Sequence, residues 1–137
     1  MHLDIVTPEA RTFSDEIESV VLPGSEGELG VLTLHSPLVT ALQPGELRYL
    51  KDGEEYSLAV GNGIVEISND YVSVLTDMAV HEHDIDEKAV EEALERARKE
   101  LSETEIVEDD EEIQKAIVQA MAQLEVHRRR KGRPTSQ

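Results

Sequence analysis

Cysteine and aromatic residues are scarce in this chain. Cysteine and tryptophan are absent, and the 137 residues include one phenylalanine and three tyrosines. The lack of cysteine excludes disulfides, catalytic thiolates and cysteine-ligated zinc, and it fits a reducing compartment. With so few rings, we expect a mainly aliphatic core and no stacking of aromatic side chains on nucleic-acid bases.

Positively charged residues are outnumbered, and long apolar runs are missing. Thirteen Lys and Arg stand against thirty Asp and Glu, which gives a formal net charge of -17 and argues against general nucleic-acid binding. No apolar run approaches the ~20 residues of a membrane span, and the first residues, MHLDIVTPEAR, do not read as a signal peptide. The sequence therefore predicts a soluble chain that meets a membrane only through a partner.

The hydrophobic period changes near residue 84. Before this point, short alternating runs predict eight strands, at residues 3–7, 17–22, 30–34, 39–42, 46–51, 55–60, 63–68 and 71–76. Their close spacing predicts an antiparallel sandwich or flattened barrel over residues 1–84. After it, apolar residues recur at helical spacing over residues 85–137. The fold class is thus β plus α, with an N-terminal β domain and a C-terminal helical domain.

Several dipeptides predict turns between the strands. Asp52-Gly53 and Asn69-Asp70 are expected to close hairpins. Pro23-Gly24 and Pro44-Gly45 are interpreted as further turns, with positive φ at Gly27 and Gly30 around a tight loop.

Two amphipathic helices are predicted in the second part. Asp84 and Glu87 form a D-x-x-E pattern that favours a helix start. The expected apolar stripes are Ala89, Val90, Ala93, Leu94, Ala97 and Leu101 on the first helix, and Ile113, Ala116, Ile117, Ala120, Met121 and Leu124 on the second. These stripes should pack as an antiparallel hairpin. Because the seam is rich in alanine, it buries little apolar area and should open readily.

Basic residues gather at the end of the chain. Residues 1–84 carry three bases and sixteen acids, whereas residues 85–137 carry ten bases and fourteen acids. Arg128, Arg129, Arg130 and Lys131 lie together there, near His127 and Arg133. They either complement the helix dipole in a solvated tail or form a docking patch for an acidic partner.

A histidine and acid cluster at the junction, His81-Glu82-His83-Asp84, superficially resembles a metal site. No further ligand set is marked, and a polar linker is the preferred interpretation. The chain also lacks the phosphate-loop, nucleophile-elbow and H-E-x-x-H motifs, so we expect no metal and no catalytic role.

Residues 23–45 read PGSEGELGVLTLHSPLVTALQPG. This order resembles the signature segment of the epsilon subunit of F-type ATP synthases, with departures at Thr33, Leu34 and Ser36. Weaker similarity extends over almost the whole chain, through both flanking strand regions and the helix pair. The resemblance implies a two-sheet β-sandwich followed by a regulatory hairpin.

The resemblance also implies partners and a location. The sandwich would bind the gamma subunit and rest on the c-ring, as a non-catalytic part of the rotor that couples proton flow to ATP synthesis. The implied contact residues are Glu26, Gly27, Glu28, His35, Ser36 and Pro37, although spacing alone favours a solvated loop acid at Glu28. An extended hairpin would inhibit ATP hydrolysis by docking Arg128 to Lys131 on the catalytic β subunits. The complex would lie at the cytoplasmic face of a bacterial plasma membrane.

Some members of that family bind ATP on the folded hairpin. Ile85 and Asp86 match the start of their motif and Arg96 matches a later arginine, but Ala89 and Val90 replace Arg-Ala. Gln119 and Gln123 stand where those members carry arginine. Because phosphates need charge-assisted donors, we predict weak or absent ATP binding and no cofactor.

Two other functions are compatible with the pattern. One is a stand-alone acidic binding module with a purely structural hairpin, and the other is a hydrolase with a metal at residues 81–84. Binding to an ATPase head argues against the module, and insensitivity to a chelator argues against the hydrolase.

Overall fold

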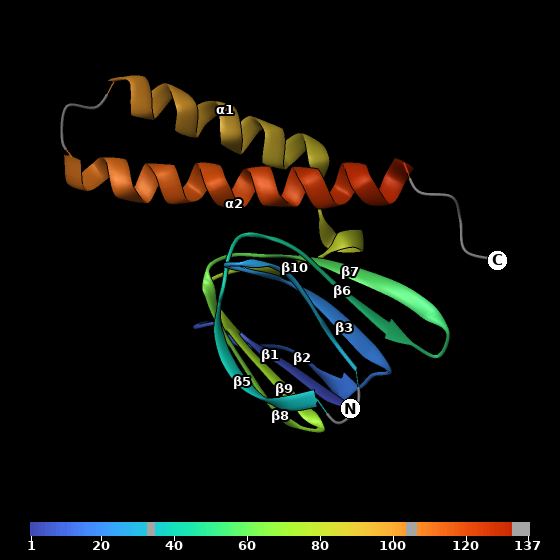
Figure 1. The fold of residues 1–137 in the computed structure, drawn as a ribbon. Coiled ribbons are helices and arrows are strands. Elements are labelled where there is room, and N and C mark those ends of the chain that lie inside the picture. The colour runs from blue at the N-terminus through green and yellow to red at the C-terminus, as the bar shows by residue number, and fades with distance from the viewer. Residues whose placement is uncertain (33–34, 104–106, 133–137) are drawn as a thin grey trace.

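The computed structural model describes residues 1–32, 35–103 and 107–132 of the chain. Strands come first, followed by a 3-10 turn, η1 (Glu82–Asp84), and two helices (Figure 1). The predicted β-sandwich with a C-terminal helical hairpin is therefore confirmed. The strands are β1 (His2–Val6), β2 (Arg11–Glu16), β3 (Ser19–Gly24), β4 (Gly27–Val31), β5 (His35–Leu42), β6 (Gly45–Lys51), β7 (Glu54–Val60), β8 (Gly63–Asn69), β9 (Tyr71–Thr76) and β10 (Ala79–His81).

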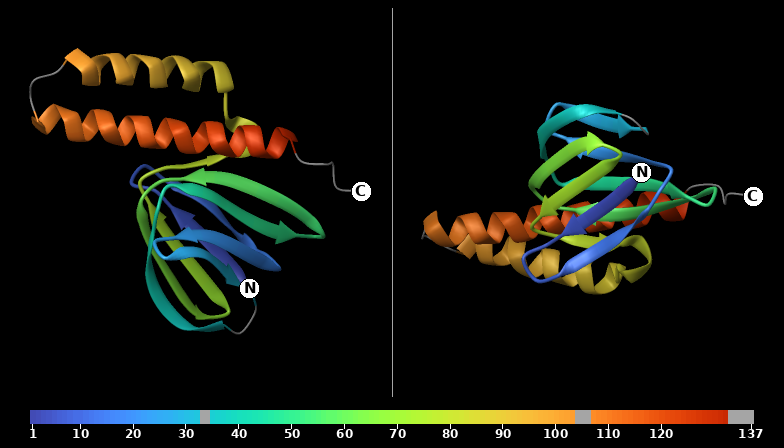
Figure 2. Two further views of the ribbon diagram at one scale, coloured as in Figure 1. Left: turned by 45° about the horizontal axis from the view of Figure 1, so that its top comes forward. Right: turned by 90° about the horizontal axis from the view of Figure 1, so that it is seen from below.

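The strands form one sheet that folds over on itself into two layers. One layer has the order β10-β7-β6-β3, with β4 on the free side of β3, and the other has the order β5-β8-β9-β1-β2. The layers join where Gly24 of β3 pairs with Leu42 of β5. Figures 1 and 2 show the layers facing each other, with the helices over the β6 and β7 side.

Alternate residues of both layers fill the core. The largest fully buried side chains of the sandwich are all aliphatic: Leu3, Ile5, Val20, Leu22, Val31, Leu47, Leu58, Val60, Val65, Ile67, Val72 and Val74. Tyr49 is also buried, and the half-buried Phe13 ring lies 4.7 Å from its ring centre. The prediction of a mainly aliphatic core is confirmed.

Two strands were missed, and two others begin three or more residues earlier than predicted. β2 and β10 were not predicted, because β2 has a largely polar sequence and β10 is three residues long. β4 begins at Gly27 instead of residue 30, and β5 begins at His35 instead of residue 39. The predicted strand residues Thr33 and Leu34 lie outside the described part of the chain.

The turn predictions are confirmed at Asp52-Gly53, Asn69-Asp70 and Gly27. Asp52 and Gly53 both have positive φ, at 52° and 78°, as a two-residue hairpin requires, and Asn69 has a φ of 50°. Gly27 has a φ of 119°, whereas Gly30 lies in β4 and does not. The prediction at Gly30 was therefore wrong.

Pro23 and Gly24 do not form a turn, contrary to the prediction. They end β3, where the Pro23 carbonyl accepts a hydrogen bond from the Gln43 amide at 2.9 Å. The chain reverses one step later, at Ser25 and Glu26, and Gly24 pairs with Gly27 across this tight turn. Proline is tolerated at this strand end because its carbonyl remains available for pairing.

The helices are α1 (Glu87–Glu103) and α2 (Val107–Gly132). Asp86 caps α1, since its Oδ1 accepts the Ala89 amide at 3.1 Å. Asp84, the predicted cap, belongs to the 3-10 turn, because the helix starts two residues later than predicted. No helix in the described ranges has the length and apolar character that crossing a membrane needs.

α2 lies between α1 and the sheet and is buried on two faces. Ala120 and Leu124 pack against Leu94 of α1, whereas Ala122 and Val126 pack against β7 and the junction. The second face was not predicted. Met121, predicted to be in the stripe, is 49% exposed because it borders the seam instead of filling it.

Candidate functional site

Glu28 was the leading predicted contact residue, and it lies on β4, just after the β3–β4 turn. Its side chain is 61% exposed, and its Oε2 accepts a hydrogen bond from Arg48 Nη1 of β6 at 3.2 Å. Glu26 and Gly27, also predicted, are exposed at the turn itself. The turn therefore presents a carboxylate that is already paired with an arginine of β6, on the other side of β3.

Ser36 and Pro37, the other described contact candidates, are exposed at the start of β5. The Ser25 amide of the turn donates to the Ala41 carbonyl, at the far end of the same strand. At about 3.3 Å per residue, the two ends of β5 are roughly 20 Å apart. The structure therefore does not bring the two groups together. His35 starts β5, and its side chain lies outside the described part.

Two of the four predicted docking residues on α2 are described, and both are paired. Arg128 Nη2 lies 2.6 Å from Glu91 Oε1 of α1. Arg129 bonds Glu125 on its own helix at 2.5 Å and Glu46 of β6 at 3.2 Å. Arg130 and Lys131 belong to the last turn of α2, and their side chains lie outside the described part. The described arginines thus connect α2 to α1 and to β6.

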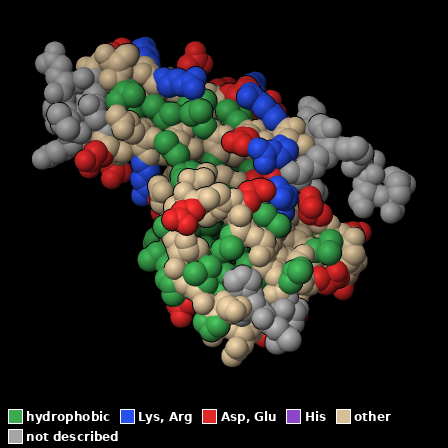
Figure 3. All heavy atoms as spheres, viewed as in Figure 1, with side chains coloured by type: hydrophobic (Ala, Val, Ile, Leu, Met, Phe, Trp, Pro, Cys, Tyr) green, Lys and Arg blue, Asp and Glu red, His purple; other side chains and the backbone are tan. Residues whose placement is uncertain are grey.

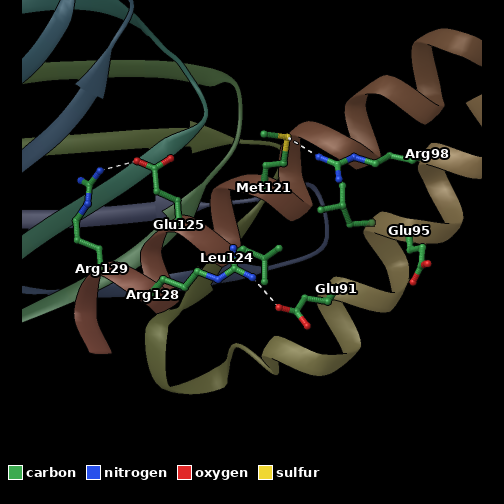
Figure 4. A pocket seen from close by; sticks show the side chains of 9 residues that line it. Glu91, Glu95, Arg98, Met121, Leu124, Glu125, Arg128 and Arg129 are labelled. Carbon is green, nitrogen blue, oxygen red and sulfur yellow. Dashed lines mark hydrogen bonds and ion pairs between the residues drawn. The ribbon is translucent and has the colours of Figure 1, made fainter. Parts of the chain in front are cut away.

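A groove of about 980 Å³ runs between α1 and α2 beside these pairs. Leu94, Met121 and Leu124 line it, with Arg98, Arg128 and three glutamates around them (Figure 4). Hydrophobic side chains are also visible along the surface of the hairpin, flanked by acidic and basic ones (Figure 3). This surface is mixed in charge and holds no catalytic arrangement.

His127 joins three elements at the hairpin base. Its Nε2 lies 2.9 Å from Glu87 of α1, and its Nδ1 lies 3.9 Å from Glu82 of the 3-10 turn. Nearer the start of α2, Lys115 Nζ lies 3.6 Å from the carboxylate of Asp77, in the loop before β10. Polar contacts from α2 therefore reach α1, the junction and the sandwich.

The three residues of the degenerate ATP motif do not form one site. Ile85 is buried against Ala59 and Val126, and Asp86 caps α1. Arg96 lines a shallow pocket of about 320 Å³ with other exposed residues of α1. Gln123 bonds the Met78 sulfur at 3.3 Å, facing the sandwich. Weak or absent ATP binding remains a prediction.

The His81 to Asp84 segment forms the end of β10 and the 3-10 turn. The rings of His81 and His83 are 5.3 Å apart, and burial, with a smaller effect from His83, lowers the pKa of His81. Within the described ranges, no three His, Asp or Glu side chains are grouped as metal ligands would be.

An exposed apolar face was missed in the sequence. Ile64 of β8 and Leu75 of β9 are paired directly, and with Val39 of β5 they are more than half exposed. A shallow apolar groove of about 390 Å³ adjoins them and reaches Val6 and Pro8. The sequence did contain a signal for this face. Two pairs of consecutive residues are apolar, Ile64-Val65 and Val74-Leu75, and consecutive apolar residues are typical of strands that are covered on both faces. Exposed apolar surface of this kind marks interaction sites.

Comparison with known proteins identifies relatives along most of the chain. Residues 1–82 match the family model of the ATP synthase delta/epsilon chain β-sandwich domain. The ATP synthase epsilon chain of Alkalilimnicola ehrlichii is 39% identical over 97% of this chain and 96% of its own length. That of Desulforamulus reducens is 46% identical over 73% of this chain and 76% of its own length.

Solved structures give the same result. A chain of the Euglena gracilis mitochondrial ATP synthase, from a structure that includes the c-ring, superposes with a TM-score of 0.73 at 25% identity, over 90% of this chain and 78% of its own length. On the strength of the sandwich match and of relatives aligned nearly end to end, this chain belongs to the ATP synthase epsilon chain family.

Proposed function

We propose that this chain is a non-catalytic rotor subunit, which joins the gamma subunit to the c-ring and restrains ATP hydrolysis through its hairpin. The observation that carries the proposal is the exposed apolar face of β5, β8 and β9 on a chain of the epsilon family. A face with Val39, Ile64 and Leu75 in water favours a partner that covers it. We assign that face to gamma.

The c-ring contact is proposed for the turn at Glu26 to Glu28 and for the start of β5 at residues 35–37. Because the turn lies beside one end of β5 and residues 35–37 form the other end, a single loop of the c-ring would not contact both. The exposed carboxylate of Glu28 is the better candidate for a polar ring loop, and residues 35–37 for the border between ring and gamma.

The hairpin is proposed as the regulatory part, comprising residues 85–137, with residues 1–84 as the anchor. In the closed form Arg128 and Arg129 are occupied by Glu91, Glu125 and Glu46. Extension would exchange these carboxylates for acidic groups on the catalytic β subunits. Because the exchange replaces one set of ion pairs with another, the two forms can be close in free energy, as a switch requires. The assembly would lie at the cytoplasmic face of the plasma membrane.

The assignment of the apolar face to gamma is tested with Ile64→Glu in a binding assay on a gamma-containing ATPase head. We expect binding to weaken about tenfold or more, since a carboxylate would be desolvated in the interface. Tyr56→Glu, at an exposed strand position of β7 in the other layer, is the matched control and should bind normally. Equal binding by both variants would remove the face from the interface.

A further inference from the structure

We propose that Glu28 controls how firmly the closed hairpin is held, through a series of charged side chains that ends at Arg129 of α2. A cationic side chain of a partner that pairs with Glu28 would then loosen the hairpin. This proposal rests on the function proposed above, and it names a route from the proposed ring contact to the proposed regulatory helix.

The series is continuous in hydrogen-bond distances. Arg48 Nη1 lies 3.2 Å from Glu28 Oε2 and 3.3 Å from Glu46 Oε1. The same Glu46 oxygen accepts from Arg129 Nη1 at 3.2 Å. One nitrogen of Arg48 therefore donates to two carboxylates, and one oxygen of Glu46 accepts from two guanidinium groups. A change at either end alters the pairing in the middle.

Burial makes the middle of the series sensitive. The Glu46 side chain is 2% exposed and Arg48 is 21% exposed, whereas Glu28 and Arg129 are 61% and 41% exposed. A buried carboxylate must be compensated by neighbouring positive charge, because water cannot solvate it. The exposed ends are the parts that a partner can reach and that hairpin opening can remove.

Charge sets the direction of the effect. Glu28, Arg48 and Glu46 on the sheet sum to one negative charge, which attracts the Arg129 guanidinium. If Glu28 is neutralised, the three residues sum to zero and Arg48 is left to Glu46 alone, so the attraction for Arg129 falls. If the charge at residue 28 is reversed, the three residues sum to one positive charge and the attraction for Arg129 falls further. Glu125 on α2 gives Arg129 a second carboxylate, so Arg129 can leave the sheet and remain paired.

The test measures how fast a thiol-specific reagent labels a cysteine placed between α2 and the sheet, in the isolated full-length chain. The labelling rate reports how often α2 leaves the sheet. The chain has no cysteine, so Val126→Cys introduces a single buried thiol that becomes accessible when α2 leaves the sheet. In this background, at low ionic strength, Glu28→Gln should raise the labelling rate about two- to fivefold, the range for one partly exposed ion pair. Glu28→Lys should raise it further. Glu26→Gln, at a neighbouring exposed acid of the turn, is the matched control and should not change it.

The route through Arg129 is tested by combining variants. Arg129→Gln alone should also speed labelling, and Glu28→Gln should then add nothing. The proposal is overturned if Glu28→Gln behaves like Glu26→Gln, or if its effect is unchanged in the Arg129→Gln background. The labelling experiment contains no ATP synthase partner, so a negative result there does not contradict the proposed rotor function. In the same way, a failure to bind the ATPase head would not contradict the coupling between Glu28 and Arg129.

Discussion

Gly63 starts β8 where two backbones approach closely. A Cβ built on this glycine would lie 1.9 Å from the Leu75 carbonyl oxygen, which belongs to the paired strand and cannot rotate away. Gly30 on β4 has open space at the same position. Residue 63 is therefore a site where the fold requires glycine, whereas residue 30 is not.

Gly63→Ala should lower the free energy of unfolding by about 1–3 kcal/mol, the usual cost of overpacking. Chemical denaturation of both alanine variants measures the difference. Gly30→Ala is the control, and we expect it to change stability little. Similar stabilities for the two variants would show that β8 and β9 can separate locally at no cost.

His81 should make stability depend on pH. Burial lowers its pKa in the folded chain, so the unfolded chain binds the proton first as the pH falls. Stability from this residue is present above the unfolded pKa of about 6.5 and declines as the pH falls through the lower folded value. His83 adds to the shift and Asp84 opposes it.

His81→Gln should therefore lose less stability than the natural chain between pH 7.5 and pH 5.5, in denaturant titrations at both pH values. His83→Gln, at a largely exposed position, should weaken the dependence only slightly, because His83 contributes less to the His81 shift than burial does. If His81→Gln and the natural chain lose equal stability, the His81 ring is not protected from protonation in the fold.

At the scale of elements, α2 is the component that joins the two parts of the molecule. Its Ala120 and Leu124 face α1, and its Ala122 and Val126 face the sheet. Small residues on both faces allow close approach but bury little area, so each seam is weak. Val126 is fully buried and supplies much of the apolar contact on the sheet side.

Val126→Ala should weaken hairpin docking by about 2 kcal/mol while the sandwich stays folded. Hydrogen exchange should accelerate in α2 and remain slow in β8 and β9. Val118→Ala, at a position 41% exposed on the same helix, is the control. If exchange accelerates equally in α2 and the central strands, the hairpin and the sandwich unfold as one unit.

Local pattern accounts for most elements of the fold. Strands rich in β-branched residues and bounded by turn signals, such as β8 and β9, and turns with fixed chemistry, such as Asp52-Gly53, were predicted correctly. β2 was missed because its sequence is largely polar, with Phe13 as its one large apolar residue. Pro23-Gly24 was misassigned because a turn dipeptide can also end a strand whose carbonyls are paired from elsewhere.

The candidate site was less predictable, because its contacts join distant parts of the chain. The basic end of α2 was visible in the sequence, but its partner Glu46 is 83 residues away and carries no local signal. The same holds for Glu28 and Arg48, which belong to strands joined only through β3. Periodicity shows which face of an element is apolar, not which charged residues meet when the elements pack.

At the scale of the whole molecule, the chain combines a sandwich and a hairpin for which we propose different roles. The sandwich is closed by a well-packed aliphatic core and offers an exposed apolar face. The hairpin is held to it by a small apolar seam and by ion pairs that a partner can replace. We therefore expect the sandwich to be the more stable part, as the proposed fixed anchor with a movable brake requires.

The most direct test of this account is ATP hydrolysis by a gamma-containing ATPase head, measured with the full chain and with a chain ending at Asp84, together with the binding of each. We predict that both bind and that only the full chain slows hydrolysis. If both bind and slow hydrolysis equally, the hairpin is not the brake; if neither binds, the chain is not the rotor subunit proposed for it.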